Sequence, residues 1–149
     1  MALRGGLILA AVLAATARAA DAQSVDLASE KKSLEAVCTK CHNLQLVMDT
    51  PKSVDEWQDT LQAMVDRGAH GTDSQFDDIM DYLHRTTTTI NVNTADADEL
   101  RLVLNVSDGV ANAIVTRRAA KKIRDLNDLK TVSGVDAAAL DTKARFIFF

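Results

Sequence analysis

The chain has 149 residues, of which 47% are hydrophobic and 26% charged, and this size suits one modest globular domain or two very small ones. The length excludes a barrel enzyme and a doubly wound sheet with a catalytic lobe. A formal net charge of −4 excludes a protein that is basic throughout. Because the chain has only one Pro and six Gly, the composition favours an all-α fold.

The first 22 residues have the pattern of a secretory signal peptide. Arg4 is followed by an apolar run over 7–15 and then by small residues up to Ala22, after which we expect cleavage. The apolar run is short for a membrane span, although a retained N-terminal anchor is the alternative. We therefore expect an exported, periplasmic protein whose mature chain has no transmembrane segment.

Charge divides the mature chain into two parts. Residues 23–88 carry twelve acidic and six basic side chains, whereas residues 89–149 carry eight acidic and nine basic ones. The change falls at the threonine run 86–89, where a helical pattern ends. We therefore place the boundary between two small domains at residues 88 and 89.

A C-x-x-C-H motif formed by Cys38, Cys41 and His42 predicts the covalent attachment of one haem c. Two thiols one helical turn apart can form thioethers with the two vinyl groups of a haem, and the adjacent imidazole can then bind the iron. No βαβ pattern supports a redox disulfide, and no second cysteine pair supports a zinc site. Since no catalytic acid, base or nucleophile stands out, we expect an electron carrier and not an enzyme.

Helical patterns surround this motif. We expect a helix from Asp26 to Lys40, and capping boxes at 53–56 and 72–75 that open two more, the first of them ending at Gly68. Such a domain has a thin core. The haem itself would therefore supply much of the buried apolar surface.

Several side chains could provide the sixth iron ligand. Met64 lies on the apolar stripe of the second helix, Met48 in a loop close to the haem motif, and His70 in a turn between helices. Met80 suits ordinary core packing, and His84 suits a cation at a helix end. We favour Met64, with Met48, His70 and an open iron as the alternatives.

Residues 30–85 resemble small mono-haem cytochrome c domains, including the cytochrome subunits of periplasmic dehydrogenases such as sulfite dehydrogenase. The shared pattern consists of the C-x-x-C-H motif followed by Trp57, Met64, Gly68-Ala69 and Tyr82-Leu83. This resemblance implies that Met64 is the axial ligand opposite His42. It also implies single-electron transfer at a relatively raised reduction potential.

Four helices are expected in the second part of the chain. They are a helix from Thr94, as its N-cap, to Leu104, one over about 109–120, one after Asp125 and one after 133–135. The chain ends with the apolar residues 146–149. We expect this end to dock on the core or on a partner.

Residues 90–149 resemble the double helix-hairpin-helix domain of competence proteins of the ComEA type. The opening over 90–95, the segment 113–117 and the segment 128–135 carry the likeness. In that family each Gly-hydrophobic-Gly hairpin binds a DNA phosphate through backbone N–H groups. An extrinsic photosystem II protein with the same fold binds protein instead, so the fold alone does not decide the partner.

The hairpins of this chain depart from the family pattern. The first reads Asn105-Val106-Ser107, and in the second, Gly134-Val135-Asp136, a carboxylate stands where the family has its second glycine. A carboxylate repels phosphate, and lost glycines restrict the close approach of the backbone. Five basic side chains could instead form an electrostatic DNA footprint or merely a solvated helix face: Arg117, Arg118, Lys121, Lys122 and Arg124.

The sequence therefore predicts an exported mono-haem c-type cytochrome that carries single electrons. We expect its helix-hairpin-helix domain to dock on a larger redox or photosynthetic protein complex, with the charge difference between the halves orienting it. The alternative is a DNA-associated cytochrome whose second domain binds the phosphate backbone.

Overall fold

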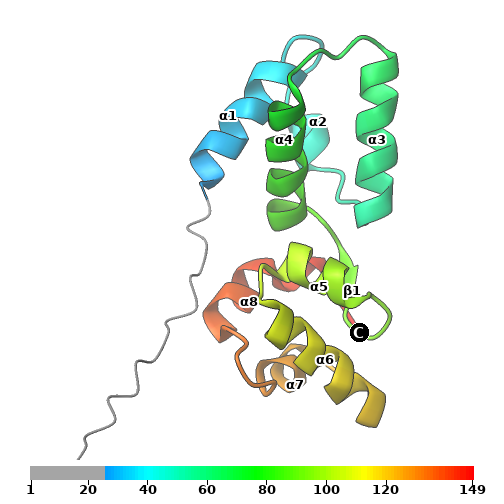
Figure 1. Cartoon of the computed structure of the whole chain (residues 1–149), viewed down its shortest axis with the longest axis vertical. Helices are drawn as coiled ribbons and strands as arrows, with labels where there is room; N and C mark the ends of the chain where they lie inside the picture. The colour runs from blue at the N-terminus through cyan, green and yellow to red at the C-terminus, as the bar shows by residue number, and fades with distance from the viewer. Residues whose placement is uncertain (1–25) are drawn as a thin grey trace, which may run out of the picture.

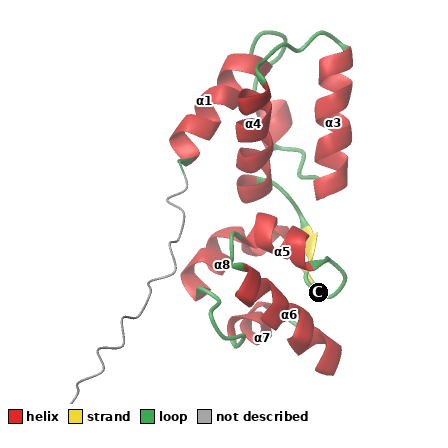
Figure 2. Cartoon of the chain, in the orientation of Figure 1, coloured by secondary structure: helices red, strands yellow, loops and turns green. Residues whose placement is uncertain are grey.

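The computed structural model describes residues 26–149, which form two helical halves, one above the other in Figure 1. The predicted signal peptide lies outside the described residues. Apart from one short pair of strands, the regular structure is helical, as Figure 2 shows, so the all-α class is confirmed. Among residues 26–149 there is no helix with the length and apolarity that a bilayer span requires.

The first half contains four helices. They are α1 (Leu27–Cys38), α2 (Gln45–Met48), α3 (Val54–Asp66) and α4 (Asp73–Thr86). The predicted capping boxes are present, since the hydroxyls of Ser53 and Thr72 accept the N–H groups of Glu56 and Gln75 while those two side chains accept in return. Gly68 follows α3 with a φ of 96°, a left-handed conformation that costs glycine little.

A small apolar core holds these helices together. Helix α1 packs along α4, and Ser33 of α1 donates to the carboxylate of Asp78 of α4 at 2.7 Å. The buried members of the core are Leu34, Val37, Trp57, Ile79 and Leu83. Met80 packs at the edge of this cluster, in agreement with its predicted role in core packing.

The second half contains two helical pairs and one pair of strands. Its elements are β1 (Ile90–Asn91), α5 (Ala97–Leu104), α6 (Asp108–Ala120), α7 (Leu126–Lys130), α8 (Ala137–Lys143), a 3-10 helix (Ala144–Phe146) and β2 (Ile147–Phe148). Helices α5 and α6 flank the first hairpin, and α7 and α8 flank the second. The side chains of Leu100, Ile114, Ile123 and Leu129 are fully buried between the pairs.

The start of α5 differs from its prediction. The sequence predicts Thr94 as the N-cap, but Asp96 takes this place and its carboxylate accepts the N–H of Glu99 at 2.8 Å. The Glu99 carboxylate in turn accepts the N–H of Asp96 at 2.9 Å. Because this capping box satisfies two backbone donors at once, it favours a start at Ala97 over a single hydroxyl cap at Thr94.

The apolar C-terminus docks on the core of its own half, which was one of the two predicted places. Ile147 pairs with Ile90 and Phe148 with Asn91 in a parallel register, and Val92 N–H donates to Phe148 O at 3.0 Å. This pairing could not be predicted from the sequence, because strands of two residues show no alternating pattern.

The threonine run at the expected domain boundary joins the two halves closely. Thr87 and Thr88 are buried, and the N–H of Thr89 donates to Lys52 O at 2.9 Å. Val54 of α3 belongs to the apolar core of the second half. The halves therefore share backbone hydrogen bonds and a part of one core.

Candidate functional site

An apolar cavity of about 250 Å³ lies within the first half. Most of its walls are aliphatic or aromatic and come from α1, α3 and α4: Leu34, Trp57, Leu61, Ile79 and Leu83. Three residues singled out from the sequence, Cys38, His42 and Met64, line the same cavity. The fold therefore brings Cys38 and His42 of the haem-attachment motif and the favoured axial methionine to one largely apolar cavity, whereas Cys41 does not line it.

The two cysteines lie at the end of α1 and in the turn that follows it. Cys38 is the last residue of α1 and is partly buried, whereas Cys41 is exposed, and both thiols are free. Burial raises the pKa of the Cys38 thiol. Both sulfurs are thus available for thioether bonds.

The imidazole of His42 is oriented by its neighbour. Its Nδ1 lies 3.0 Å from the backbone oxygen of Asn43. Because a carbonyl oxygen can only accept, Nδ1 carries the proton in this contact and Nε2 keeps its lone pair. Metal-binding histidines commonly have such a carbonyl partner, so the environment of His42 fits an iron ligand.

The other predicted candidates for the sixth ligand lie elsewhere. Met48 lines a separate cavity near the C-terminus, and His70 is exposed in the turn between α3 and α4. Met80 packs at the edge of the core cluster and is not among the residues of the haem-motif cavity. Of the methionines and histidines proposed from the sequence, Met64 is the one that shares a cavity with His42.

His84 is not the helix-end cation that the sequence suggests. Its side chain lies in the last turn of α4, the residue is only 6% exposed, and neither ring nitrogen has a hydrogen-bond partner among residues 26–149. Burial lowers the pKa of His84; Asp81 opposes this shift, and Arg85 and Lys143 add to it. Burial therefore disfavours the charged form of this ring.

Trp57 supplies a polar atom to the wall of this largely apolar cavity. Its indole Nε1 is buried and has no hydrogen-bond partner within the chain described. A buried donor without an acceptor costs about 1–3 kcal/mol, so a polar group of a bound molecule would offset this cost. The thiol of Cys38, an oriented imidazole, a thioether and an unsatisfied N–H line this cavity, and the Cys41 thiol is exposed in the turn between Cys38 and His42. These groups would fit haem c.

Each hairpin of the second half contains a residue in the left-handed conformation. Asn105 ends α5 with a φ of 52°, and Gly134 has a φ of 87°. Asparagine adopts the left-handed conformation more readily than most other side chains. Asn105 can therefore supply this turn without a glycine.

The chain's own side chains cap the helices that follow the hairpins. The Asp136 carboxylate accepts the N–H groups of Ala138 at 2.8 Å and Ala139 at 3.2 Å. The Ser107 hydroxyl accepts the N–H of Val110 at 3.4 Å. Backbone donors that could face a phosphate at the second hairpin are thus already satisfied by a negative charge.

The hairpins also share a cavity with the first half. Residues 104–108 and 134–136 line a space of about 570 Å³ together with Asp81, His84 and Arg85 of α4. Because α4 borders the hairpins, the face that carries them is turned toward the first half.

The predicted basic residues lie at the C-terminal end of α6 and in the loop that follows, and we call them the basic tip. They are Arg117, Arg118, Lys121, Lys122 and Arg124. Two of them hold the structure together, since Arg117 Nη2 lies 2.7 Å from Asp128 Oδ1 and Arg118 Nη1 donates to Val92 O at 2.7 Å. Lys121 and Lys122 are exposed and form no ion pair with any described residue.

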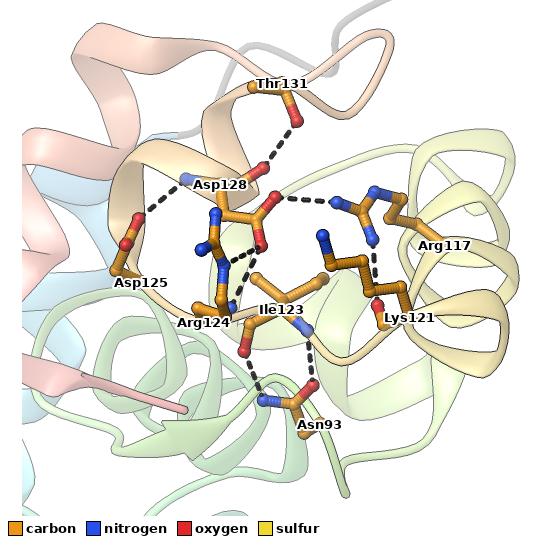
Figure 3. A network of polar contacts seen from close by, with 8 residues as sticks. All are labelled: Asn93, Arg117, Lys121, Ile123, Arg124, Asp125, Asp128 and Thr131. Atoms are coloured by element: carbon orange, nitrogen blue, oxygen red, sulfur yellow. Dashed lines mark hydrogen bonds and ion pairs between the residues drawn. The ribbon is translucent and has the colours of Figure 1, made fainter.

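Asp128 and Asn93 fix the loop of the basic tip, as Figure 3 shows. Asp128 accepts the N–H of Arg124 at 3.1 Å, and this bond, with the guanidinium groups of Arg117 and Arg124, holds the pKa of Asp128 below its usual value. The Asn93 side chain both donates to and accepts from the backbone of Ile123, at 2.8 and 3.0 Å. Neither residue was predicted to hold this loop; the i, i+4 spacing of Arg124 and Asp128 is the one sequence signal that could have indicated Asp128.

Comparison with known proteins bears on the second half. A family model described as a helix-hairpin-helix motif matches residues 86–148, so the predicted motif is confirmed there. The match gives no support to a cytochrome c domain over 23–88. No curated protein and no solved structure matches the chain.

Proposed function

We propose that this protein is an exported c-type cytochrome whose helix-hairpin-helix half binds DNA, so that one covalently attached haem is held at the nucleic acid. The observation that carries the haem assignment is the meeting of Cys38, His42 and Met64 at one apolar cavity. The helix-hairpin-helix match and the basic tip support DNA as the partner, which the sequence alone ranked second to a redox complex.

Four side chains would hold the haem. Cys38 and Cys41 would bind it through thioethers, with His42 and Met64 as the iron ligands. The bound group supplies reversible one-electron chemistry. The contact of His42 with Asn43 O keeps the imidazole in the tautomer that can bind metal, and the largely apolar lining of the cavity would favour a raised potential.

The haem assignment is tested by expressing the chain with a cytochrome maturation system. We expect a red product whose mass exceeds that of the polypeptide by one haem. A Cys38→Ala/Cys41→Ala variant should lack the covalent haem, and Met64→Ala should lose the absorption band of the methionine–iron bond. A colourless product at the bare polypeptide mass would reject the assignment.

DNA binding is tested by gel shift with the haem-loaded protein at low and moderate salt. We expect a shift that weakens steeply with salt, because phosphate contacts release counterions. No shift at low salt would reject DNA as the partner.

A redox protein complex is the second candidate partner. Leu46 lines the cavity of the haem motif and is 64% exposed, so an apolar side chain beside the cofactor is available for docking. Under this reading the protein does not shift DNA but co-purifies with a membrane or periplasmic redox complex under mild detergent.

A further inference from the structure

We propose that DNA docks on the basic tip of this protein and not on its two hairpins. The inference rests on the proposed DNA binding and names the face that performs it. It would make the hairpins structural connections between helices, and it would place the bound duplex at the end of the second half that lies away from the first.

The surroundings of the hairpins disfavour a phosphate. The Asp136 carboxylate already accepts two N–H groups at the start of α8. The cavity beside both hairpins is lined by three carboxylates, those of Asp81, Asp108 and Asp136. Each of these carboxylates would repel a phosphate. The two arginines that line the cavity are already paired: Arg85 pairs with Glu30 and Asp81. Arg101 pairs with Asp98 and Asp108.

The basic tip offers the opposite environment. Over residues 117–128 there are five basic and two acidic side chains, and of the basic ones Arg117 and Arg124 are paired with Asp128. Lys121 and Lys122 are exposed, and no described carboxylate pairs with them. The C-terminal end of α6 points away from the acidic first half in Figure 1, so a polyanion can reach the tip without passing that half.

The loop of the tip is held in place before any ligand arrives. Asn93 bonds both backbone groups of Ile123, and Asp128 holds Arg117 and the N–H of Arg124 (Figure 3). Lys121 and Lys122 therefore extend from a fixed backbone, which reduces the ordering cost of binding.

The side chains of the tip favour a DNA duplex that is bound through its phosphate backbone. Lysines act as point charges toward phosphate and carry little sequence information. The segment 111–135 contains no aromatic residue on which an unpaired base could stack. We therefore expect binding to double-stranded DNA without sequence preference, and weaker binding to single strands of equal length.

Fluorescence anisotropy of the haem-loaded protein with a labelled random-sequence duplex tests this face. We expect Lys121→Ala/Lys122→Ala to weaken binding about tenfold at low salt and to lower the salt slope by about 2. The matched control is Lys31→Ala/Lys32→Ala, which removes an adjacent pair of exposed lysines from α1 and should leave the affinity unchanged. Asp136→Asn should change it less than twofold.

The outcomes separate this inference from the proposed function. Wild-type protein that binds no duplex overturns both. Binding that survives Lys121→Ala/Lys122→Ala, or that strengthens severalfold in Asp136→Asn, keeps DNA as the partner and overturns the basic tip as its docking face.

Discussion

Gly134 illustrates how a single position in the second hairpin is fixed by its surroundings. Its φ of 87° lies in the left-handed region, and a Cβ placed there would lie 2.7 Å from Val110 Cγ2. We expect Gly134→Ala to lower the free energy of unfolding by about 2–4 kcal/mol, through backbone strain and overpacking together. Chemical denaturation followed by circular dichroism measures this loss.

Gly109 is the matched control for that substitution. It lies in the first turn of α6, where an added Cβ would come no closer than 3.9 Å to Ser107 Oγ. Gly109→Ala should leave stability unchanged or raise it, because alanine favours helix more than glycine does. If both variants lost the same stability, the contact with Val110 would not explain the need for glycine.

The residue types alone predict only some features of the hairpins and of the cavity. The sequence showed that Asn105 replaces a family glycine, but not that asparagine would keep the left-handed turn. It placed Cys38, Cys41 and His42 together because their spacing is local. Which methionine shares a cavity with His42 depends on how α1, α3 and α4 come together, and no local pattern contains this information.

The last turns of α4 and α8 place charged groups close together. Lys143 is largely buried and donates to Val103 O, and its pKa is lowered to about 8 by burial and by the charge of Arg85. His84 and Asp81 of α4 are the other titratable groups facing this junction. Keeping Lys143 charged here therefore destabilises the fold at neutral pH.

The pH dependence of stability follows from this shift. The pKa of Lys143 is about 8 in the folded chain and near 10.5 in the unfolded chain, so the unfolded state binds more protons between these values. The free energy of unfolding should rise by about 1–3 kcal/mol from pH 8 to pH 10.5. Denaturation at several pH values measures the rise, and Lys143→Met should abolish most of it; an equal rise in that variant would assign it to other groups.

Elements with local signals were predicted well, and those formed by distant contacts were not. The capping boxes at Ser53 and Thr72 lie within four residues, so the starts of α3 and α4 could be read from the sequence. The pairing of Ile90 with Ile147 joins two ends of a domain. The burial of His84 likewise depends on packing that the pattern of α4 alone does not specify.

The basic tip and the acidic first half, which contains the haem motif, lie at opposite ends of the folded molecule in Figure 1. If DNA binds at the tip, the cavity of the haem motif stays free for an electron donor or acceptor, because the cavity and the tip do not share residues. The acidic half would repel DNA and thereby help to orient the duplex toward the tip.

Such an arrangement requires the halves to move as one body, and Val54 tests this. It lies at the start of α3 in the first half but is buried, 7% exposed, in the core of the second half. Val54→Ala should lower the free energy of unfolding by about 2 kcal/mol. Trp57 fluorescence, which reports the first half, and hydrogen exchange of the Ile114 amide, which reports the second, should reveal the same loss.

The matched control is Val65→Ala on the same helix, where the side chain is 38% exposed and the same methyl groups are removed from a surface site. It should change neither probe by more than about 0.5 kcal/mol. If Val54→Ala destabilised the second half while the transition of Trp57 stayed in place, the halves would unfold independently. The cavity of the haem motif and the basic tip would then be joined by the chain at Thr87 and Thr88 without being mechanically coupled. DNA bound at the tip would not fix the orientation of a haem held at that cavity.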